Sequence, residues 1–184
     1  MTISERFSRL AQQEYSPRAR LTAMALESLV FLFGIPACLV GLASTGGERW
    51  RFESSLAVVA VCLVLAVLGL SLGLWTVWVQ FRYARGTPVP IMATKKLLTE
   101  GPYSLCRNPM AFGTFVFYFG IAAATSSFRA VLAVAVFVIA LLAYIKVIEE
   151  KEVSFRFGDE YAQYKQSTPF IIPRLWRLGK GPRT

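Results

Sequence analysis

Two clusters of polar residues border the apolar stretches of this chain, and both carry groups that bind charged ligands. Arg107 and Asn108 belong to the segment GPYSLCRNPMAFG, residues 101–113, which leads directly into an apolar run. Glu149 and Glu150 follow the last long apolar run. A guanidinium holds a carboxylate through paired hydrogen bonds, and carboxylates accept hydrogen bonds from ribose hydroxyls or an ammonium. Together these groups suit a small zwitterionic or nucleotide-like ligand at a membrane surface.

The apolar runs between the two clusters are expected to bring them together. Runs 110–126 and 128–148 are separated by only one or two residues, so their helices must form a tight antiparallel hairpin. The start of one helix then lies beside the end of the other, and we expect the arginine and asparagine to approach the two glutamates. The alternative is a positively charged flank and a solvated helix end without a ligand. On composition alone the two interpretations are evenly matched.

The composition as a whole is that of a membrane protein. The chain has 184 residues, of which 55% are hydrophobic and 17% charged, and its mean hydropathy is +0.50. A helix that crosses a bilayer needs roughly 20 apolar residues. The sequence therefore predicts an all-α integral membrane protein forming a single domain with four spans, at about 21–43, 55–79, 110–126 and 128–148.

The distribution of Lys and Arg predicts the orientation of these spans. Basic residues outnumber acidic ones by four to two in residues 1–20, five to one in 81–108 and eight to five in 145–184. Short cytoplasmic loops carry an excess of Lys and Arg, so we expect these flanks and both termini in the cytoplasm. A bacterial inner membrane and an endoplasmic reticulum membrane both satisfy this asymmetry, and we expect the inner or plasma membrane of a bacterium.

Amphipathic stretches flank the spans at both ends. Residues 3–10 place apolar side chains on one helical face among arginines, and residues 153–164 repeat this pattern among charged residues. Both patterns predict helices that lie in the membrane interface. Gly158 is a point at which the second helix is open to interruption.

Several kinds of site are excluded by the residue types present. The chain has no histidine, which rules out histidine acid–base catalysis and histidine ligation of a metal. Its three cysteines form no CxxC pair, so we expect neither a metal site nor a disulfide framework. We interpret Cys106, beside Arg107, as a packing residue. The net charge of +9 is spread over the flanks of the spans, which argues against nucleic-acid binding.

The two polar clusters resemble the paired motifs of the isoprenylcysteine carboxyl methyltransferase family, whose close relatives are the phospholipid methyltransferases. The first family motif, G-P-Y-x-x-x-R-[HN]-P-M-Y-x-G, is similar to residues 101–113, and the second, E-E-x-x-L-x-x-x-F-G-x-x-Y-x-x-Y, to residues 149–164. The resemblance covers roughly residues 69–173. It implies an integral membrane methyltransferase that uses S-adenosylmethionine and acts on a lipophilic or membrane-embedded acceptor, through a carboxylate, a thiol or a lipid head group.

The resemblance also implies roles for single residues. It points to Arg107, Asn108 and Glu150 as the catalytic centre, with a cofactor-binding loop at 86–109 and a C-terminal tail at 149–173 that closes the site. The positions it implies for cofactor binding are Gly101, Pro102, Tyr103, Arg107, Asn108, Pro109, Gly113, Glu149, Glu150, Tyr161 and Tyr164. A lipidic acceptor is expected to enter from the bilayer.

Three positions depart from the family pattern. Asn108 stands where the better-studied branches have histidine, Ala111 where tyrosine is common, and Val153 where leucine is usual. An amide donates and accepts hydrogen bonds but transfers no proton. Methyl transfer depends mainly on positioning and on exclusion of water, so the reaction is compatible with this change. An amine acceptor is disfavoured, because its proton must pass to a glutamate or to water.

Two other functions remain open. Membrane sterol reductases resemble the same fold and carry a related R-[HN]-P-x-Y segment, but they bind NADPH; the second motif fits the methyltransferases better. A non-catalytic membrane scaffold is favoured by Ala111 and the missing histidine, and opposed by the retention of Arg107 with both glutamates. The identity of the bound cofactor separates these functions. No feature of the sequence selects the methyl acceptor or the oligomeric state.

Overall fold

The computed structural model describes residues 16–45, 47–84 and 96–174. The amphipathic stretch expected at 3–10 and residues 86–95 of the expected cofactor-binding loop lie outside the described residues. Within them the fold is helical. The α-helices are α2 (Pro17–Leu29), α3 (Ile35–Ser44), α4 (Leu56–Val79), α5 (Pro109–Ala124), α6 (Phe128–Tyr144) and α7 (Glu150–Ser167). Shorter 3₁₀ or π turns are η1 (Val30–Gly34), η2 (Glu48–Trp50), η3 (Gln80–Ala84), η4 (Gly101–Ser104) and η5 (Ile145–Glu149).

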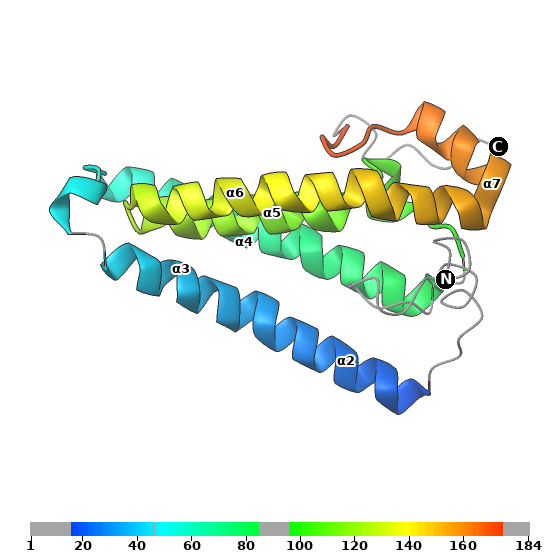
Figure 1. The fold of residues 1–184 in the computed structure, drawn as a ribbon, viewed down its shortest axis with the longest axis horizontal. Helices are drawn as coiled ribbons and strands as arrows, with labels where there is room; N and C mark the ends of the chain where they lie inside the picture. Colours follow the sequence, from blue (N-terminus) through cyan, green and yellow to red (C-terminus); the bar gives the residue numbers. More distant parts are fainter. Residues whose placement is uncertain (1–15, 46, 85–95, 175–184) are drawn as a thin grey trace.

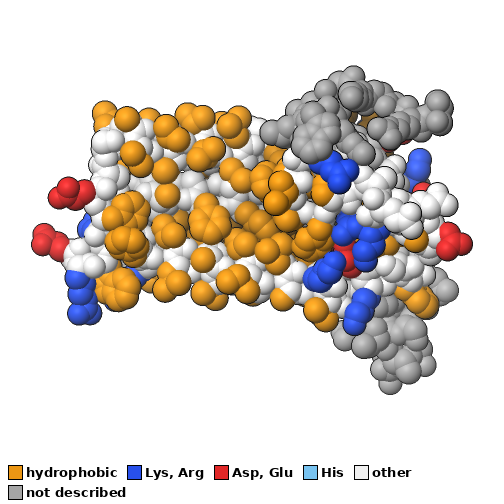
Figure 2. All heavy atoms as spheres, turned by 90° about the horizontal axis from the view of Figure 1, so that it is seen from above, with side chains coloured by type: hydrophobic (Ala, Val, Ile, Leu, Met, Phe, Trp, Pro, Cys, Tyr) orange, Lys and Arg blue, Asp and Glu red, His pale blue; other side chains and the backbone are white. Residues whose placement is uncertain are grey.

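The length and composition of the helices are those of a multi-pass membrane protein. Three helical stretches are long and apolar enough to cross a bilayer, Leu21–Ser44, Leu56–Tyr83 and Phe128–Ser167. The apolar part of the last stretch ends at Ile148. Helix α5 is a shorter apolar helix of 16 residues, or ~24 Å at 1.5 Å per residue. Hydrophobic side chains cover the middle of the molecule, and charged side chains gather at its two ends (Figure 2).

Helices α4 and α5 pack backbone to backbone along a line of glycines. A Cβ atom added at Gly69 would lie 2.5 Å from the backbone nitrogen of Phe117, and one at Gly113 would lie 2.7 Å from the carbonyl oxygen of Gly69. At Gly120 it would lie 2.6 Å from the carbonyl oxygen of Cys62. Small residues allow this close approach of apolar helices. We call this contact the glycine seam; it fixes the start of α5 relative to α4.

The first long helix, α2–η1–α3, is interrupted by a π turn directly before Pro36. The N–H of Ile35 bonds to the carbonyl of Val30, so in this register the carbonyl of Phe31 faces Pro36, which has no N–H to donate. The hydroxyl of Tyr118 on α5 donates to the Phe31 carbonyl instead, at 2.9 Å. The distortion at Pro36 thus takes the form of a π turn that is tied to α5.

Helices α5 and α6 form the expected antiparallel hairpin (Figure 1). They are joined through Thr125 to Ser127, and Ser126 adopts a positive φ of 54° in this turn. Beyond α6 the helix continues through η5 into α7, and it breaks at Gly158, where φ is 49° and ψ is −124°. The expected interruption at Gly158 is therefore confirmed. The second half of α7 folds back over the loop that precedes α5 (Figure 1).

Candidate active site

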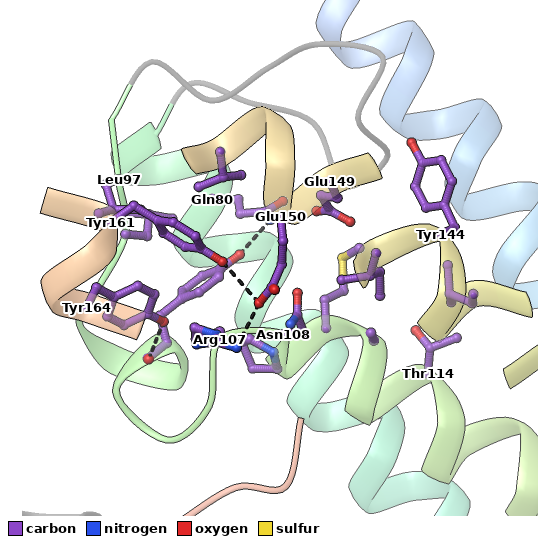
Figure 3. A pocket seen from close by; sticks show the side chains of 18 of the residues that line it. Gln80, Leu97, Arg107, Asn108, Thr114, Tyr144, Glu149, Glu150, Tyr161 and Tyr164 are labelled. Carbon is purple, nitrogen blue, oxygen red and sulfur yellow. Dashed lines mark hydrogen bonds and ion pairs between the residues drawn. The ribbon is translucent and has the colours of Figure 1, made fainter. Parts of the chain in front are cut away.

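A cavity of about 290 Å³ lies where α5 begins and α6 ends. Its size is near the lower end of the ~300–1,000 Å³ that is common for small-molecule sites. The predicted site residues that line it are Tyr103, Arg107, Asn108, Pro109, Glu149, Glu150, Tyr161 and Tyr164. Figure 3 shows most of these side chains gathered from three separate parts of the chain. The hairpin therefore brings the two polar clusters of the sequence into one site.

The centre of the site is an ion pair between Arg107 and Glu150. Arg107 Nη2 lies 2.7 Å from Glu150 Oε1, and the two side chains are only 7% and 6% exposed. The hydroxyl of Tyr161 donates to the same oxygen at 3.2 Å. The other carboxylate oxygen is approached by Lys146 at 3.0 Å and by Lys165 at 3.4 Å. The approach of Arg107 predicted from the sequence is confirmed for Glu150.

These contacts determine the ionisation of Glu150. Burial opposes the charged form, but the hydrogen bond from Lys146 and the charges of Arg107 and Lys165 outweigh it, so the pKa of Glu150 lies below its ordinary value. Burial and the negative charge of Glu150 raise the pKa of Tyr161. Near neutral pH the site thus holds a carboxylate and a neutral phenol that donates to it.

Arg107 is also held by the C-terminal tail. Its Nη1 donates to the carbonyl of Lys165 at 3.0 Å, and its backbone N–H donates to the carbonyl of Pro169 at 2.8 Å. The guanidinium lies over the ring of Phe170. One donor, Nε, is buried and has no hydrogen-bond partner within the described residues. A buried N–H left unpaired costs ~1–3 kcal/mol, so Nε is a donor that a ligand in the cavity can satisfy.

Tyr103 links the loop before α5 to η3 and α7. Gln80 on η3 donates a hydrogen bond to the Tyr103 hydroxyl, and Tyr164 donates to the Tyr103 carbonyl at 2.7 Å. Burial raises the pKa of both tyrosines, so both stay neutral. The Gln80 Oε1 atom is buried without a hydrogen-bond partner in the described part of the chain. Gln80 thus brings an unpaired acceptor to the cavity wall, whereas Arg107 brings an unpaired donor, Nε.

Asn108 lines the cavity together with both glutamates, as expected, and it also holds the tail. Its side-chain amide donates to the carbonyl of Phe170 at 2.9 Å, rather than to the glutamates. The amide lines the cavity while it fixes the tail, because Asn108 directly precedes α5 and the tail crosses at that point. The amide that stands at the family's histidine position is thus accommodated by the Phe170 carbonyl of the tail.

Glu149 lies apart from the ion pair. Figure 3 shows its carboxylate on the side of Tyr144 and Thr114, away from Arg107 and Tyr161. No hydrogen bond or ion pair joins it to another side chain among the described residues. Burial, together with the negative charges of Glu152 and Glu150, raises the pKa of Glu149 to about 7. The two adjacent glutamates are therefore different chemical groups at neutral pH.

Three of the residues expected to bind the cofactor do not line the cavity. Gly101 adopts a positive φ of 60° beside α4, Pro102 is fully buried, and Gly113 faces α4 in the glycine seam. Their roles in the structure are to shape the loop and to let α5 approach α4. Cys106 is also fully buried, and burial raises the pKa of its thiol to about 11. Its interpretation as a packing residue is consistent with both observations.

Residues 57–160 match the family model described as phospholipid methyltransferase. This range begins in α4 and includes the glycine seam, the loop before α5 and both glutamates. The chain belongs to the phospholipid methyltransferase family. The resemblance recognised in the two motifs is thereby confirmed at the family level. Most residues that line the cavity lie within the part of the chain that matches this family of membrane methyltransferases.

Two curated relatives carry names that refer to metal resistance. The chain is 35% identical over 133 residues to the cobalt-zinc-cadmium resistance protein CzcN of Cupriavidus metallidurans, covering 71% of this chain and 56% of that one. It is 37% identical over 82 residues to the nickel-cobalt-cadmium resistance protein NccN of Alcaligenes xylosoxydans xylosoxydans, covering 44% of this chain and 37% of that one. The matches thus span about half of the first relative and less of the second.

Several residues that line this family member's cavity or contact its ion pair are absent from the two motifs. Gln80 and Thr114 belong to apolar helical stretches, and Lys165 follows the second motif by one position. Lys146 lies one turn before Glu150, and that spacing is a signal for a helical ion pair. No pattern in the sequence indicated a role for Phe170, because its contact with Arg107 and Asn108 depends on the path of the tail.

Proposed function

We propose that this protein is an S-adenosylmethionine-dependent methyltransferase that acts on a lipophilic, membrane-embedded acceptor. The observation that carries the proposal is the buried Arg107–Glu150 ion pair, which lines a cavity and lies within the region that matches the methyltransferase family. The surplus polar atoms on the cavity wall support it further, because they leave both a donor and an acceptor for a ligand.

The residues of the cavity fit the chemistry of S-adenosylmethionine, a nucleoside joined to an amino acid. Arg107 Nε and Gln80 Oε1 offer an unpaired donor and an unpaired acceptor, and Glu150 with Tyr161 offers a polar, charged wall. When bound, the cofactor supplies a methyl group activated by a sulfonium. The residues proposed to hold it are Gln80, Tyr103, Arg107, Asn108, Pro109, Glu150, Tyr161 and Tyr164.

The contribution of the protein to the reaction is then positioning and exclusion of water. Tyr164 and Arg107 connect the loop before α5 to α7 and the tail, which cover the polar half of the cavity. Interactions of this kind fix reacting groups in place and strengthen electrostatic contacts by removing water. Arg107 and Glu150 act together, since each neutralises the buried charge of the other.

A second cavity supports entry of the acceptor from the bilayer. It has a volume of about 120 Å³ and lies between α2–η1, α4 and α5. It shares Phe31, Met110 and Thr114 with the first cavity. Most of its wall is apolar, with Glu27 and Ser28 among its polar residues. We propose that an apolar part of the acceptor lies here while its reactive group reaches the first cavity.

The proposed topology places this site at the cytoplasmic face. In it α5 is a short fourth crossing beside α4 and both termini are cytoplasmic. The excess of Lys and Arg in the sequence of 81–108 and 145–184 assigns these flanks to the cytoplasm, and described residues of both flanks line the cavity. The proposed location is the inner membrane of a bacterium. If the chain serves the same process as the relatives named for metal resistance, its contribution is methylation of a membrane component.

The proposal is tested by calorimetric titration of the detergent-purified protein with S-adenosylmethionine, S-adenosylhomocysteine and NADPH. We expect micromolar binding of the first two ligands, lost in Arg107→Ala and in Glu150→Gln and kept in Lys151→Gln, a control on the exposed side of α7. Binding of NADPH alone would assign the protein to the reductases. If none of the three ligands binds, the scaffold function is correct instead.

A further inference from the structure

Adjacent glutamates of the candidate site have opposite surroundings. The Glu150 carboxylate is contacted by Arg107, Lys146, Lys165 and the Tyr161 hydroxyl. Such a carboxylate is fixed in its ionised form and has little capacity left to take up a proton. Glu149 has no hydrogen bond or ion pair to any side chain within the described residues, although its side chain lines the same cavity. It remains free to exchange a proton with a ligand.

Glu149 lies at the boundary between the polar and the apolar half of the cavity. Figure 3 shows Arg107, Tyr161 and Tyr164 on one side of Glu150, and Glu149 on the other side with Tyr144 and Thr114. Thr114 also lines the second cavity, where we place the apolar part of the acceptor. A group that arrives from the second cavity therefore meets Glu149 before it reaches the ion pair.

The surroundings of Glu149 allow its carboxyl group to take up and release a proton near neutral pH. Burial is the main cause of its raised pKa, and the negative charges of Glu152 and Glu150 on the same helix add to it. The cation that lines this cavity, Arg107, is engaged by Glu150. The neighbouring titratable groups on the described elements are Tyr103 on η4, Tyr144 on α6 and Tyr161 on α7.

We propose that Glu149 is the proton acceptor of the methyl transfer, and that the methyl acceptor is a proton-bearing nucleophile, a thiol or an ammonium, on an apolar chain. This inference rests on the proposed function. The nucleophile gives one proton to the Glu149 carboxylate, and the lone pair so freed forms the new bond to the methyl carbon. The electron pair of the broken carbon–sulfur bond stays on the sulfur, which becomes a neutral thioether. The proton then passes from Glu149 to water.

The same arrangement is unsuited to a carboxylate acceptor. A carboxylate is already deprotonated and needs no proton acceptor, and its negative charge would be brought next to ionised Glu149 without a free cation in the described cavity wall to balance it. Asn108 cannot take the proton, because an amide has no basic site at neutral pH. Glu149 thus supplies the function that the family's histidine position lacks in this chain.

The first test is cofactor binding, which separates this inference from the proposed function. We expect Glu149→Gln to bind S-adenosylmethionine within about threefold of the parent, whereas Glu150→Gln loses binding. Equal loss in both variants would make Glu149 a cofactor ligand and overturn the inference while leaving the proposed function standing. Failure of the parent itself to bind would overturn the proposed function.

The second test measures transfer of tritiated methyl from S-adenosylmethionine to dodecanethiol, dodecylamine and dodecanoic acid in detergent, from pH 6 to pH 10. We expect transfer to the thiol or the amine, with a rate that rises through about pH 7 in the parent. Glu149→Gln should be ~100-fold slower or more at pH 7. The deficit should shrink toward pH 10, as the nucleophile loses its proton to water.

Glu152→Gln is the matched control, because it removes a neighbouring negative charge without removing a group from the cavity wall. We expect it to keep its activity and to shift the rise in rate to lower pH. Three results would overturn the inference: methyl ester formation on dodecanoic acid, a deficit in Glu149→Gln that is the same at every pH, or no transfer to any of the three chains by protein that binds the cofactor.

Discussion

Two of the contacts that helix α5 makes with its neighbours, the one to α4 and the one to the α2–α3 helix, differ in kind. Against α4 it packs through glycines whose backbones touch, with no space for a Cβ atom at Gly69 or Gly113. Against the α2–α3 helix it packs through side chains around Tyr118, toward the α3 end, and α2 diverges from α4 at the other end (Figure 1). The second cavity lies in that divergence.

This difference separates rigid and accessible parts of the same helix bundle. The glycine seam fixes the position from which the loop 101–108 reaches over the cavity, so the Arg107–Glu150 pair depends on it. The α2 face leaves an opening that a lipophilic molecule can enter. The proposed function needs fixed polar groups and access for a membrane-soluble acceptor. The α4 side of α5 suits the first need, and the α2 side suits the second.

The largest expected effect comes from adding a side chain to the glycine seam. Gly113→Leu places atoms within 3 Å of the α4 backbone, which cannot move aside, so we expect a loss of about 3 kcal/mol or more and failure to yield folded protein. Thermal unfolding followed by circular dichroism in detergent measures it. Gly73→Ala is the control, because a Cβ atom there meets nothing within 4 Å. Equal damage by both changes would contradict a seam specific to Gly69 and Gly113.

The next effect compares two cations that contact Glu150. Arg107→Ala removes the buried cation at 2.7 Å from Glu150. We expect a loss of about 3 kcal/mol in the free energy of unfolding, because the only cations left beside this buried carboxylate are half in solvent. Lys146→Ala removes a cation that is 55% exposed, and we expect a loss below ~1 kcal/mol. Unfolding in detergent at pH 7 measures both, and a larger loss for Lys146→Ala would refute the assignment of Arg107 as the main partner.

A smaller effect depends on pH and concerns Glu149. Its pKa in the folded protein, about 7, is raised above its ordinary value of 4.5, so the folded state holds the proton more tightly than the unfolded state. The contribution of this group to the stability of the folded state is fully present below pH 4.5, and it is lost as the pH rises through 7. Glu149→Gln should therefore raise stability above pH 8 relative to the parent, on the order of 2 kcal/mol, and change it little at pH 4.5.

The measurement is the unfolding temperature of parent and variant at a series of pH values. Glu48→Gln, an exposed glutamate in the turn at the opposite end of the molecule, is the control. A Glu149→Gln protein whose stability follows the same pH curve as the parent would show that this carboxyl does not titrate near pH 7.

The smallest effect tests the contact between α5 and the π turn. Tyr118→Phe removes the hydrogen bond to the Phe31 carbonyl, and we expect a loss of about 1 kcal/mol. Pro36→Ala supplies a backbone N–H to that carbonyl, so the loss from Tyr118→Phe should be smaller in a Pro36→Ala background. A double-mutant cycle on unfolding free energies measures the coupling, and additive losses would contradict it.

The sequence was sufficient to predict the elements with strong local signals. Long apolar runs predicted the membrane helices, and the short interval between 110–126 and 128–148 predicted the hairpin that joins Arg107 to Glu150. The break at Gly158 was predicted because glycine tolerates a backbone conformation that other residues avoid. In each case the information lies within a few residues of the feature itself.

Other parts of the site depend on contacts between distant segments and could not be read from spacing. Asn108 lines the cavity with the glutamates as expected, but the hydrogen bond of its amide to the carbonyl of Phe170, 62 positions along the chain, was not predicted. The motif gave Glu149 and Glu150 one common role, whereas burial and neighbouring charges make them differ. Gly113 was expected to bind the cofactor, but it does not line the first cavity, and its lack of a side chain allows the close contact with α4.

The hydrogen bonds between the loop before α5 and the tail have a consequence for biosynthesis. Arg107 and Leu105 are bonded to residues between Lys165 and Arg174, and chains are made from the N-terminus at ~5–20 residues per second. The glycine seam can form as soon as α5 has been inserted, whereas the polar half of the cavity stays open until the tail has left the ribosome. The protein therefore completes its candidate site only after its apolar helices are in place.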